Sequence, residues 1–572
     1  MRFALPTAAA AAAVIAASAV AVSAATTYNL EVTYVDNVNP SNTQARRVIG
    51  INGAWPPPLV VANYNDSLTV NVKNSLDVPT SMHSHGIFFK GQNYLDGAAG
   101  VTQCGIPPGE SFTYQYVPQQ WGTYWYHAHL NGQYVDGFRG PLIIRPPTEV
   151  YKYDAEYIVV VGDWYHEQFS EIMKSYAGIH NPTGSEPPPD SVVILIHDGT
   201  KYIDNMTFAP GKTYRLRLIN MSAFTMYHIS IGGHSMDVIE VDGEDTNRKT
   251  TNGFWLSVAS RWSVLVTAKD TTDKNYQMDL GVDTSMFAII PPTLQLNYTT
   301  PIIYNPASPL DATPAPWEEL DDMTLEPHVV EPSQAPDQSI TLDVLLDMLD
   351  DGINHGMFNE VPYSKPKVPT IFTAMSTGGN ATNVDIYGKR TSAYVLEHNK
   401  VIRVIINNND GGSHPFHLHG HRFQIVARND SLYDPSQPPA WWVNPVRRDI
   451  VQVPAMGSAV IQFRADNPGI WAFHCHIEWH MQTGLFATFV EAPLEMQQSI
   501  KIPQVLYDQC NKLGTPSAGN AAGNLDVLDM TGEVEGPNLI SGGWDRTGKI
   551  ALAFTILAAL LGLATVVWFG ST

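Results

Sequence analysis

Short runs of alternating apolar and polar residues begin near Thr26 and recur along most of the chain. YNLEVTYV and SLTVNVKN are two such runs, and Pro, Gly and Asn separate each run from the next. A period of two places every second side chain on one face of a strand, and frequent turn residues are typical of β-sandwiches. The pattern therefore predicts an all-β protein whose first domain covers residues 26–147 and ends at GPLIIRPP.

Similar runs continue beyond this first domain. YRLRLINMS and HSMDVIEVDG predict a second β domain over residues 148–300, which holds no metal motif and is expected to be a spacer. Residues 301–339, rich in Pro, Asp and Glu, are expected to form a surface linker to a third domain over residues 340–495. There, TLDVLLDMLDDG is compatible with a helix or with a strand and a turn. The Gly/Asn/Asp-rich residues 496–549 are expected to be an irregular or flexible tail.

Both ends of the chain are apolar. Residues 1–25 have a basic residue near the start, an Ala/Val-rich centre and small residues at the end, which indicates a secretory signal. Residues 550–569 contain no charge and are long enough to cross a bilayer as a membrane anchor. The small residues 541–543 before this apolar segment also approximate a GPI-attachment signal. Six N-x-S/T sequons fit a glycosylated secreted chain, at Asn65, Asn205, Asn220, Asn297, Asn380 and Asn429.

Composition changes this picture little. Apolar residues make up 44% of the chain, and 43 Gly and 41 Pro suit a turn-rich β protein. The formal net charge of −22 argues against a nucleic-acid partner. It is compatible with a cationic substrate, because a negative surface raises the local concentration of cations.

The strongest chemical signal is the stretch WAFHCHIEWH. In an extended strand His474 and His476 point to one face and Cys475 to the other, so that one strand contacts two metal sites. Cys475 with His480, five residues later, suits a redox-active copper held by thiolate and imidazole. The backbone of Cys475 would then be a short electron route to a second copper cluster.

Three more His-x-His pairs occur in MHSHG, WYHAHL and HPFHLHG. Each pair places two imidazoles on one strand face and can help to enclose a multinuclear site. His414 lies three residues before His417 and can serve a different metal. The isolated His180, His197 and His421 are expected to be ordinary hydrogen-bonded core or surface residues. The paired residues are His83 and His85, His127 and His129, and His417 and His419.

These four motifs, in this order and at these separations, resemble those of the multicopper oxidases, and most closely the fungal iron-uptake ferroxidases, from about Tyr28 onward. The resemblance implies three cupredoxin-like, Greek-key β-sandwich domains and four copper ions. Leu485 stands where some relatives have an axial Met, so the type 1 copper is expected to be three-coordinate with a raised potential. The implied ligands are His414, Cys475 and His480 for type 1, His83 and His417 for type 2, and His85, His127, His129, His419, His474 and His476 for the type 3 pair.

The resemblance also implies roles for other residues. Asp96 in NYLDG and Glu478 resemble carboxylates that deliver protons to the type 2 and type 3 coppers, although Asp96 could equally be a turn residue that caps its own loop. Cys104 and Cys510 remain once Cys475 is assigned to copper. In an oxidising compartment they could form a disulfide, as the resemblance to related laccases supports, or they could remain two buried thiols.

Two carboxylates, Glu186 and Asp410, match positions that select iron in the ferroxidase branch. Hard anionic oxygens hold Fe(III) better than Fe(II), so such a pocket makes electron loss from iron easier. Two positions depart from the family pattern. The third iron-site Asp aligns with Ala288, although Asp283 is nearby, and a family Tyr aligns with His355. These departures predict an iron site that is looser or shifted toward organic reductants.

The expected function is therefore oxidation of Fe(II) coupled to reduction of O2 to water, by an enzyme anchored in the plasma membrane with its catalytic domains outside. GPI anchoring and a vacuolar membrane are the alternative locations. Analogy with fungal iron uptake implies an iron permease as partner. The alternative functions are a laccase-like oxidase of phenols or pigment precursors, and a copper store or structural surface glycoprotein. The full set of eleven copper ligands argues against the last of these.

Overall fold

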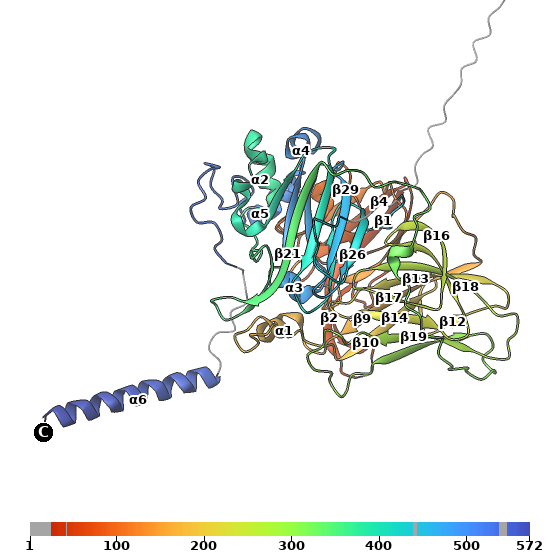
Figure 1. The fold of residues 1–572 in the computed structure, drawn as a ribbon, viewed down its shortest axis with the longest axis horizontal. Helices are drawn as coiled ribbons and strands as arrows, with labels where there is room; N and C mark the ends of the chain where they lie inside the picture. The colour runs from red at the N-terminus through yellow and green to blue at the C-terminus, as the bar shows by residue number, and fades with distance from the viewer. Residues whose placement is uncertain (1–24, 42, 439–442, 537–545, 572) are drawn as a thin grey trace, which may run out of the picture.

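The computed structural model describes residues 25–41, 43–438, 443–536 and 546–571. The predicted secretory signal lies outside the described residues except for Ala25. The described residues form six β-sheets, and each successive segment of the chain contributes two of them. This confirms the prediction of an all-β protein with three sandwich domains (Figure 1).

Domain 1 combines a sheet of strand order β2-β1-β4-β6 with a sheet of order β3-β8-β7-β5. The alternation that predicted these strands reappears as burial, because Leu68, Val70 and Val72 of β4 are buried while the residues between them are more exposed. Its elements are β1 (Ala25–Val38), β2 (Arg46–Ile51), β3 (Val60–Asn63), β4 (Ser67–Asn74), β5 (His83–His85), η1 (Asn93–Leu95), β6 (Ser111–Tyr116), β7 (Gly122–His127) and β8 (Arg139–Arg145).

Domain 2 combines a sheet of order β11-β10-β9-β13-β18-β15-β16 with one of order β12-β20-β19-β14-β17. Its elements are β9 (Ala155–Trp164), α1 (Phe169–Tyr176), β10 (Ser191–His197), β11 (Tyr202–Ile203), β12 (Met206–Thr207), β13 (Thr213–Asn220), β14 (Tyr227–Ile231), β15 (Met236–Val241), β16 (Glu244–Thr251), β17 (Gly253–Leu256), β18 (Arg261–Thr267), β19 (Tyr276–Val282) and β20 (Asn297–Ile303).

Domain 3 combines the orders β22-β21-β24-β29-β26-β27 and β23-β31-β30-β25-β28. The stretch TLDVLLDMLDDG forms the strand β21 and the turn after it, which decides between the two interpretations of that stretch. The elements are β21 (Gln338–Met348), β22 (Asn354–Phe358), α2 (Thr370–Ser376), η3 (Gly378–Thr382), η4 (Val384–Tyr387), η5 (Lys389–Thr391), β23 (Ala393–Leu396), β24 (Val401–Asn408), β25 (His414–Leu418), β26 (Phe423–Asn429), β27 (Arg447–Arg448), β28 (Ile450–Val453), β29 (Ser458–Arg464), β30 (Gly469–Cys475), α3 (Glu478–Gln482) and β31 (Phe486–Glu491).

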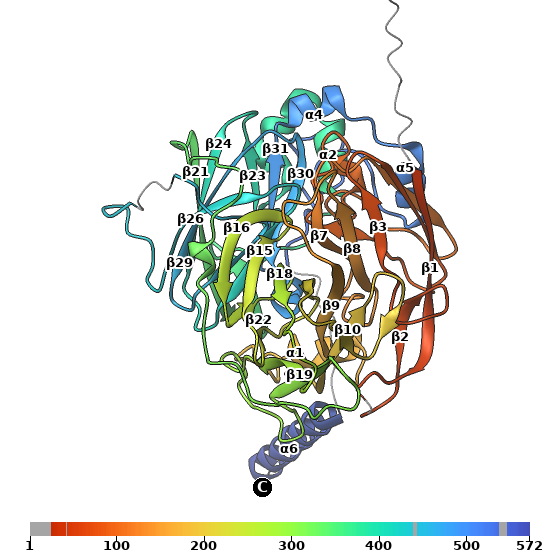
Figure 2. The same cartoon turned by 90° about the vertical axis from the view of Figure 1, so that its right-hand side faces the viewer.

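One topology repeats in the three domains. The first strand of each domain pairs antiparallel with the next strand and parallel with a later one, as β1 does with β2 and β4, β9 with β10 and β13, and β21 with β22 and β24. The chain therefore builds the same sandwich three times. Figure 2 shows the red and orange strands of domain 1 beside the blue strands of domain 3. At this junction the imidazole of His85 in β5 stacks on that of His417 in β25.

The linker between domains 2 and 3 is slightly shorter than the expected residues 301–339, and it contacts domain 3 rather than lying only on the surface. Strand β20 extends to Ile303 and β21 begins at Gln338, and the short helix η2 (Asp322–Thr324) lies between them. Asp322 is buried, and its Oδ2 accepts a hydrogen bond of 2.5 Å from Arg448 of domain 3. The linker is therefore attached to the domain interface by an ion pair rather than lying only on the surface.

The prediction of a flexible tail is wrong for its first part. Helices α4 (Pro493–Ser499) and α5 (Gln504–Lys512) follow domain 3, and Leu506 and Cys510 of α5 are buried. Cys510 forms a disulfide with Cys104 of domain 1, and Gln509 donates a hydrogen bond to the carbonyl oxygen of Ser111. The composition of the tail did not predict an ordered helix, because α5 has no long apolar face. Contacts with domain 1, which is distant in the sequence, position it instead.

Helix α6 (Arg546–Ser571) contains the predicted anchor and lies apart from the β domains in Figure 1. Within the described residues it is the one helix, over Gly548–Ser571, that is long and apolar enough to cross a membrane, with a mean hydropathy of 2.6. None of the most apolar part of this helix is buried against the rest of the protein. Its apolar side chains are therefore available to lipid.

The structure removes one of the six predicted glycosylation sites. Asn220 is fully buried, and its side-chain amide donates to the carbonyl oxygens of Thr225 (2.9 Å) and Leu256 (3.0 Å). A glycan cannot be placed on this amide in the folded domain. The other five sequons begin with an exposed Asn and remain predicted sites.

Candidate metal centre

A cluster of one thiol and two imidazoles lies within domain 3. His414 begins β25, Cys475 ends the neighbouring strand β30, and His480 lies in α3, which directs it back toward the sulfur. The Cys475 Sγ lies 3.7 Å from His414 Nδ1 and 3.6 Å from His480 Nδ1, and the two Nδ1 atoms are 3.1 Å apart. All three residues are buried, so their donor atoms converge on one enclosed point.

The neighbouring imidazoles make Cys475 a better thiolate donor. Burial alone raises the pKa of the Cys475 thiol, but hydrogen bonds and charge from His414 and His480 outweigh burial and lower the pKa to about 7. A thiolate with two imidazoles in a nearly trigonal arrangement is the donor set that proteins use for redox-active copper. Leu485 is buried beside this cluster and cannot act as a ligand, and its carbonyl oxygen accepts a hydrogen bond from the Cys475 amide.

Carboxylates contact the outer nitrogens of both imidazoles. His414 Nε2 lies 3.1 Å from Asp410 Oδ2, and His480 Nε2 lies 2.7 Å from Glu186 Oε1. Asp410 comes from the loop between β24 and β25, whereas Glu186 comes from domain 2, between α1 and β10. Burial acts to raise the pKa of Asp410, but contact with His414 lowers it below its usual value. Both positions predicted from the resemblance are therefore adjacent to the cluster.

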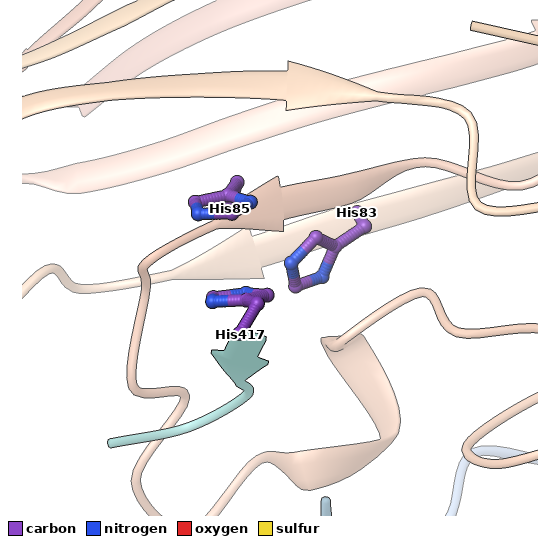
Figure 3. Close-up of side chains that lie close together, drawn as sticks. All are labelled: His83, His85 and His417. Atoms are coloured by element: carbon purple, nitrogen blue, oxygen red, sulfur yellow. The ribbon is translucent and has the colours of Figure 1, made fainter. Parts of the chain in front are cut away.

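Eight further histidines gather where domain 1 meets domain 3, and all eight are buried. Their nitrogens form three groups whose members lie within 4.8 Å of one another. Figure 3 shows one group, in which His83 and His85 of β5 approach His417 of β25. The rings of His85 and His417 are stacked, with their centroids 3.7 Å apart. The groups are His83, His85 and His417, then His85, His127 and His476, and then His129, His419 and His474.

Several buried nitrogens of these rings have no hydrogen-bond partner, and they indicate whether metal ions fit between the rings. In His83, His127 and His417 the Nδ1 lies within 3.0 Å of a backbone carbonyl oxygen, and the buried Nε2 has no hydrogen-bond partner. His474 Nε2 lies 3.2 Å from His419 Nε2 and 3.4 Å from His129 Nε2. Buried nitrogens without partners are costly unless a cation occupies the space that they share. The donor set therefore fits metal ions bound by neutral imidazole.

Two buried carboxylates neighbour this histidine cluster, Asp96 by direct contact and Glu478 by its place two residues after His476 in the chain. Asp96 is fully buried, its Oδ2 lies 2.9 Å from His419 Nδ1, and its backbone oxygen lies 2.7 Å from His83 Nδ1. These contacts argue against a residue that only caps its own loop. Glu478 is buried in α3, where its Oε1 accepts a hydrogen bond of 2.7 Å from Gln482, and burial raises the pKa of Glu478 to about 7.

The two departures from the family pattern lie around the His414/Cys475/His480 cluster. Ala288 is exposed on the loop after β19, and Met286 of that loop packs against Gly412, beside Asp410. Asp283 accepts hydrogen bonds from Ser285 within its own loop.

His355 of β22 is buried beside Thr483, the residue that directly follows α3. Its ring nitrogens lie 3.3 Å from the Thr483 carbonyl oxygen and 2.9 Å from Asp351 Oδ2. Neither Ala288 nor His355 has a side-chain oxygen that could bind a metal ion.

The isolated histidines behave as ordinary residues. His197 Nδ1 accepts a hydrogen bond from the Gly199 amide, and His421 pairs with buried Glu491 at 2.6 Å. His180 is exposed on the surface. Sequence reasoning missed Asp449, which lies beside His417, because a single Asp after two Arg residues forms no recognisable motif.

A buried imidazole cluster between β-sandwich domains, together with a thiolate–imidazole cluster inside one of them, defines a class of metal-binding proteins whose donors suit redox-active copper. Family models described as multicopper oxidase match residues 31–149, 155–303 and 361–495. The chain belongs to the multicopper oxidase family.

Several known proteins are similar over nearly the whole chain. The iron multicopper oxidase fer1 of Mycosarcoma maydis is 42% identical, over 94% of this chain and 92% of that protein. The iron transport multicopper oxidase fio1 of Schizosaccharomyces pombe is 41% identical, over 95% of this chain and 89% of that protein. Among solved structures, Fet3p, a multicopper oxidase that functions in iron import, has a TM-score of 0.85 and 36% identity over 90% of this chain and all of that chain. A laccase from Botrytis aclada has a TM-score of 0.75 and 28% identity over 86% of this chain and 92% of that chain.

Proposed function

We propose that the protein oxidises Fe(II) with O2. Four Fe(II) ions each lose one electron, and one O2 takes up the four electrons and four protons to become two water molecules. The observation that carries the proposal is the pair of carboxylates, Glu186 and Asp410, on the outer nitrogens of His480 and His414. The similar proteins named for iron transport support the same substrate.

Four copper ions would supply one-electron transfer and the reduction of O2. His414, Cys475 and His480 would hold the type 1 copper, and His83 and His417 the type 2 copper. The grouping of the remaining nitrogens supports a finer division of the type 3 pair, with one ion on His85, His127 and His476 and the other on His129, His419 and His474.

Glu186 and Asp410 would bind the iron. In this proposal each carboxylate keeps one oxygen on an imidazole nitrogen and offers the other to Fe(II). Anionic oxygens stabilise Fe(III) over Fe(II), so the two residues favour electron loss and place the iron beside His480 and His414. The carboxylate and imidazole then connect the iron with Cys475, and the backbone leads on to His474 and His476, the residues on either side of Cys475.

Two buried carboxylates would handle protons. Glu478 has a pKa of about 7, so it can hold a proton and release it near neutral pH. Asp96 contacts His419 and His83, so it can orient both rings and accept or donate a proton between them. Both roles extend the sequence-based expectation.

We further propose that α6 anchors the enzyme at the cell surface, with the plasma membrane preferred over a vacuolar membrane. The apolar surface of α6 and the similarity to iron-transport proteins support this location. An iron permease is the partner that this function calls for, because the Fe(III) product would have to cross the membrane. Copurification with a permease from detergent extracts would test the partnership.

Oxidation of phenols is the second candidate. Ala288 and His355, which supply no iron ligand, and the similarity to a laccase favour it. Steady-state kinetics with Fe(II) and with a bulky phenol distinguish the two functions. Glu186→Ala and Asp410→Ala should lower kcat/KM for Fe(II) by about tenfold or more, since loss of a charged contact costs about 1.5–3 kcal/mol, and phenol oxidation should change little.

Glu167→Ala is the control, because it removes an exposed carboxylate of domain 2, the domain that carries Glu186. It should leave the oxidation rates of Fe(II) and of the phenol unchanged. Unchanged Fe(II) kinetics in both site variants would favour the laccase function. Parallel loss of both activities would indicate general damage to the cluster. Bound copper without any consumption of O2 would instead support a storage role.

A further inference from the structure

Arg261, at the start of β18 in domain 2, is a fully buried residue that contacts all three domains. Its NH1 and NH2 donate to Oδ1 and Oδ2 of Asp449 in domain 3, at 2.7 and 2.5 Å. Its Nε donates to the carbonyl oxygen of Thr123 in domain 1, at 3.1 Å, and NH1 donates to the carbonyl oxygen of Ala259 in domain 2, at 3.2 Å. One guanidinium therefore holds three domains in a fixed relation.

Asp449, the partner of Arg261, also contacts the eight-histidine cluster. Its backbone oxygen lies 2.9 Å from His417 Nδ1, and its Oδ1 lies 3.4 Å from His85 Nε2. The opposite nitrogen of each ring, His417 Nε2 and His85 Nδ1, is buried without a partner. The nitrogens left for metal are therefore those that face away from Asp449, so Asp449 selects which nitrogen of each ring is the ligand atom.

Gly86, directly after His85, makes room for this arrangement. Its backbone has a φ of +87°, and a Cβ at this position would lie 2.6 Å from Asp449 Oδ2 and 2.7 Å from Arg261 NH2. The chain of domain 1 can therefore pass this close to the ion pair only with glycine at position 86.

Other charges support the same contact. Asp242 of domain 2 accepts a hydrogen bond of 2.9 Å from the Arg261 amide and one of 2.7 Å from Arg448 Nε of domain 3. Charges of opposite sign thus alternate across the buried interface between domains 2 and 3. A buried bidentate pair that is itself flanked by hydrogen bonds has little freedom to move.

We infer that Arg261 is a positioning residue for the copper cluster, through which domain 2 orients, by way of Asp449, the type 2 ligand His417 and the type 3 ligand His85. The inference rests on the copper assignment proposed above. It adds to the expectation that domain 2 is a spacer, because this domain then controls the geometry of a cluster to which it contributes no ligand.

The test is Arg261→Lys, which keeps the positive charge and loses the bidentate contact. The type 2 copper signal in electron paramagnetic resonance should shift or disappear, with about 10–100-fold loss in type 2 copper affinity or in turnover, as is typical when a partner of a metal ligand is removed. The type 1 blue absorbance should persist, because His414, Cys475 and His480 do not contact Arg261.

Arg217→Lys is the matched control. Arg217 is also fully buried in domain 2, pairs with Glu156 at 2.9 Å and donates to Thr123 Oγ1 at 2.9 Å. Its ion-pair and hydrogen-bond partners in the described residues include no copper-site histidine. This control should lower the thermal unfolding midpoint and leave the type 2 signal unchanged. Asp449→Asn, of nearly the same size as the native residue, should reproduce the type 2 change seen in Arg261→Lys.

Several outcomes separate the hypotheses. In the first outcome, the type 2 copper signal is normal in the wild type and unchanged in Arg261→Lys and Asp449→Asn, and only the unfolding midpoints of the variants fall. This outcome overturns the positioning role and leaves the copper function intact. Loss of type 1 absorbance together with the type 2 signal in both variants also overturns it, because the damage is then general. A wild-type protein loaded with copper that lacks a type 2 signal overturns the proposed function, and the inference with it.

Discussion

His480 Nε2 lies 2.7 Å from Oε1 of Glu186, a contact between domain 3 and a loop of domain 2. The two residues are 294 positions apart in the chain. The Nδ1 of the same imidazole faces Cys475. Glu186 of domain 2 is therefore connected to the candidate copper site of domain 3 through the single ring of His480. A change at Glu186 should therefore alter the properties of the copper as well as the binding of substrate.

Glu186→Gln should raise the reduction potential of the type 1 copper. The substitution keeps an oxygen that can accept the hydrogen bond from His480 but removes a negative charge that stabilises Cu(II) over Cu(I). The rise should be on the order of tens of millivolts, as expected for one partly screened charge. Redox titration of the blue absorbance measures it, with Glu167→Gln as the control. An unchanged or lower potential would argue against electrostatic coupling through His480.

Ala288→Asp should lower KM for Fe(II). Ala288 is exposed on the loop whose Met286 packs beside Asp410, so a carboxylate here can approach the iron that Asp410 is proposed to bind. A gain of one charged contact predicts about a tenfold increase in kcat/KM. Ile290→Asp adds the same charge to the same loop and is the control. An equal gain in both variants would mean general attraction of cations rather than a third ligand.

Cys475→Ser should abolish the blue colour and the turnover together. The intense visible absorbance of a type 1 site arises from the bond between thiolate and Cu(II), and serine offers no thiolate. The eight-histidine cluster should keep its copper, because Cys475 belongs to none of its groups. Absorption spectra and copper analysis of the purified variant provide the check. Blue absorbance in this variant would rule out the type 1 assignment.

Because of Glu240, the free energy of unfolding of the protein should decrease at low pH. This buried residue of β15 accepts hydrogen bonds from the Thr123 amide of domain 1 and pairs with Arg215 and Arg217. Burial acts to raise the pKa of Glu240, but the two guanidinium groups outweigh it and lower the pKa from 4.5 to about 2.

The folded state therefore prefers the carboxylate. The stabilisation from Glu240, about 3 kcal/mol, should be complete above pH 4.5 and should be lost as the pH falls through 2. Unfolding midpoints measured between pH 2 and 7 test this. Glu240→Gln should be less stable at neutral pH and should show a shallower loss of stability in acid. An identical pH profile for the variant and the wild type would contradict the assignment.

Removal of residues 546–572 should release an active soluble enzyme. Every proposed copper ligand and the Cys104–Cys510 disulfide lie before α6, and α6 is not buried against the domains. The truncated protein should keep the Fe(II) kinetics of the full chain. Treatment of the full chain with a GPI-specific phospholipase distinguishes the two modes of anchoring. Release by that enzyme would replace the spanning helix with a lipid anchor.

The sequence by itself determined the fold class and pointed to the residues that gather in the candidate metal centre. Alternation of apolar and polar residues is a local property of each strand, so runs such as SLTVNVKN predicted strands without any partner. The same period of two separated Cys475 from His474 and His476, and the structure places them in different clusters. Both predictions succeeded because they depend on residues at most a few positions apart.

Tertiary structure decided what depends on distant segments. It showed which histidines share a group, that Glu186 contacts His480, that α5 is ordered by its bridge to Cys104, and that Asn220 is buried. Arg261 has no motif around it, yet it contacts all three domains at once. Asn220 is buried within domain 2, and the other relationships arise where segments of different domains pack together. The local pattern of a strand carries no information about the residues that packing will bring against it.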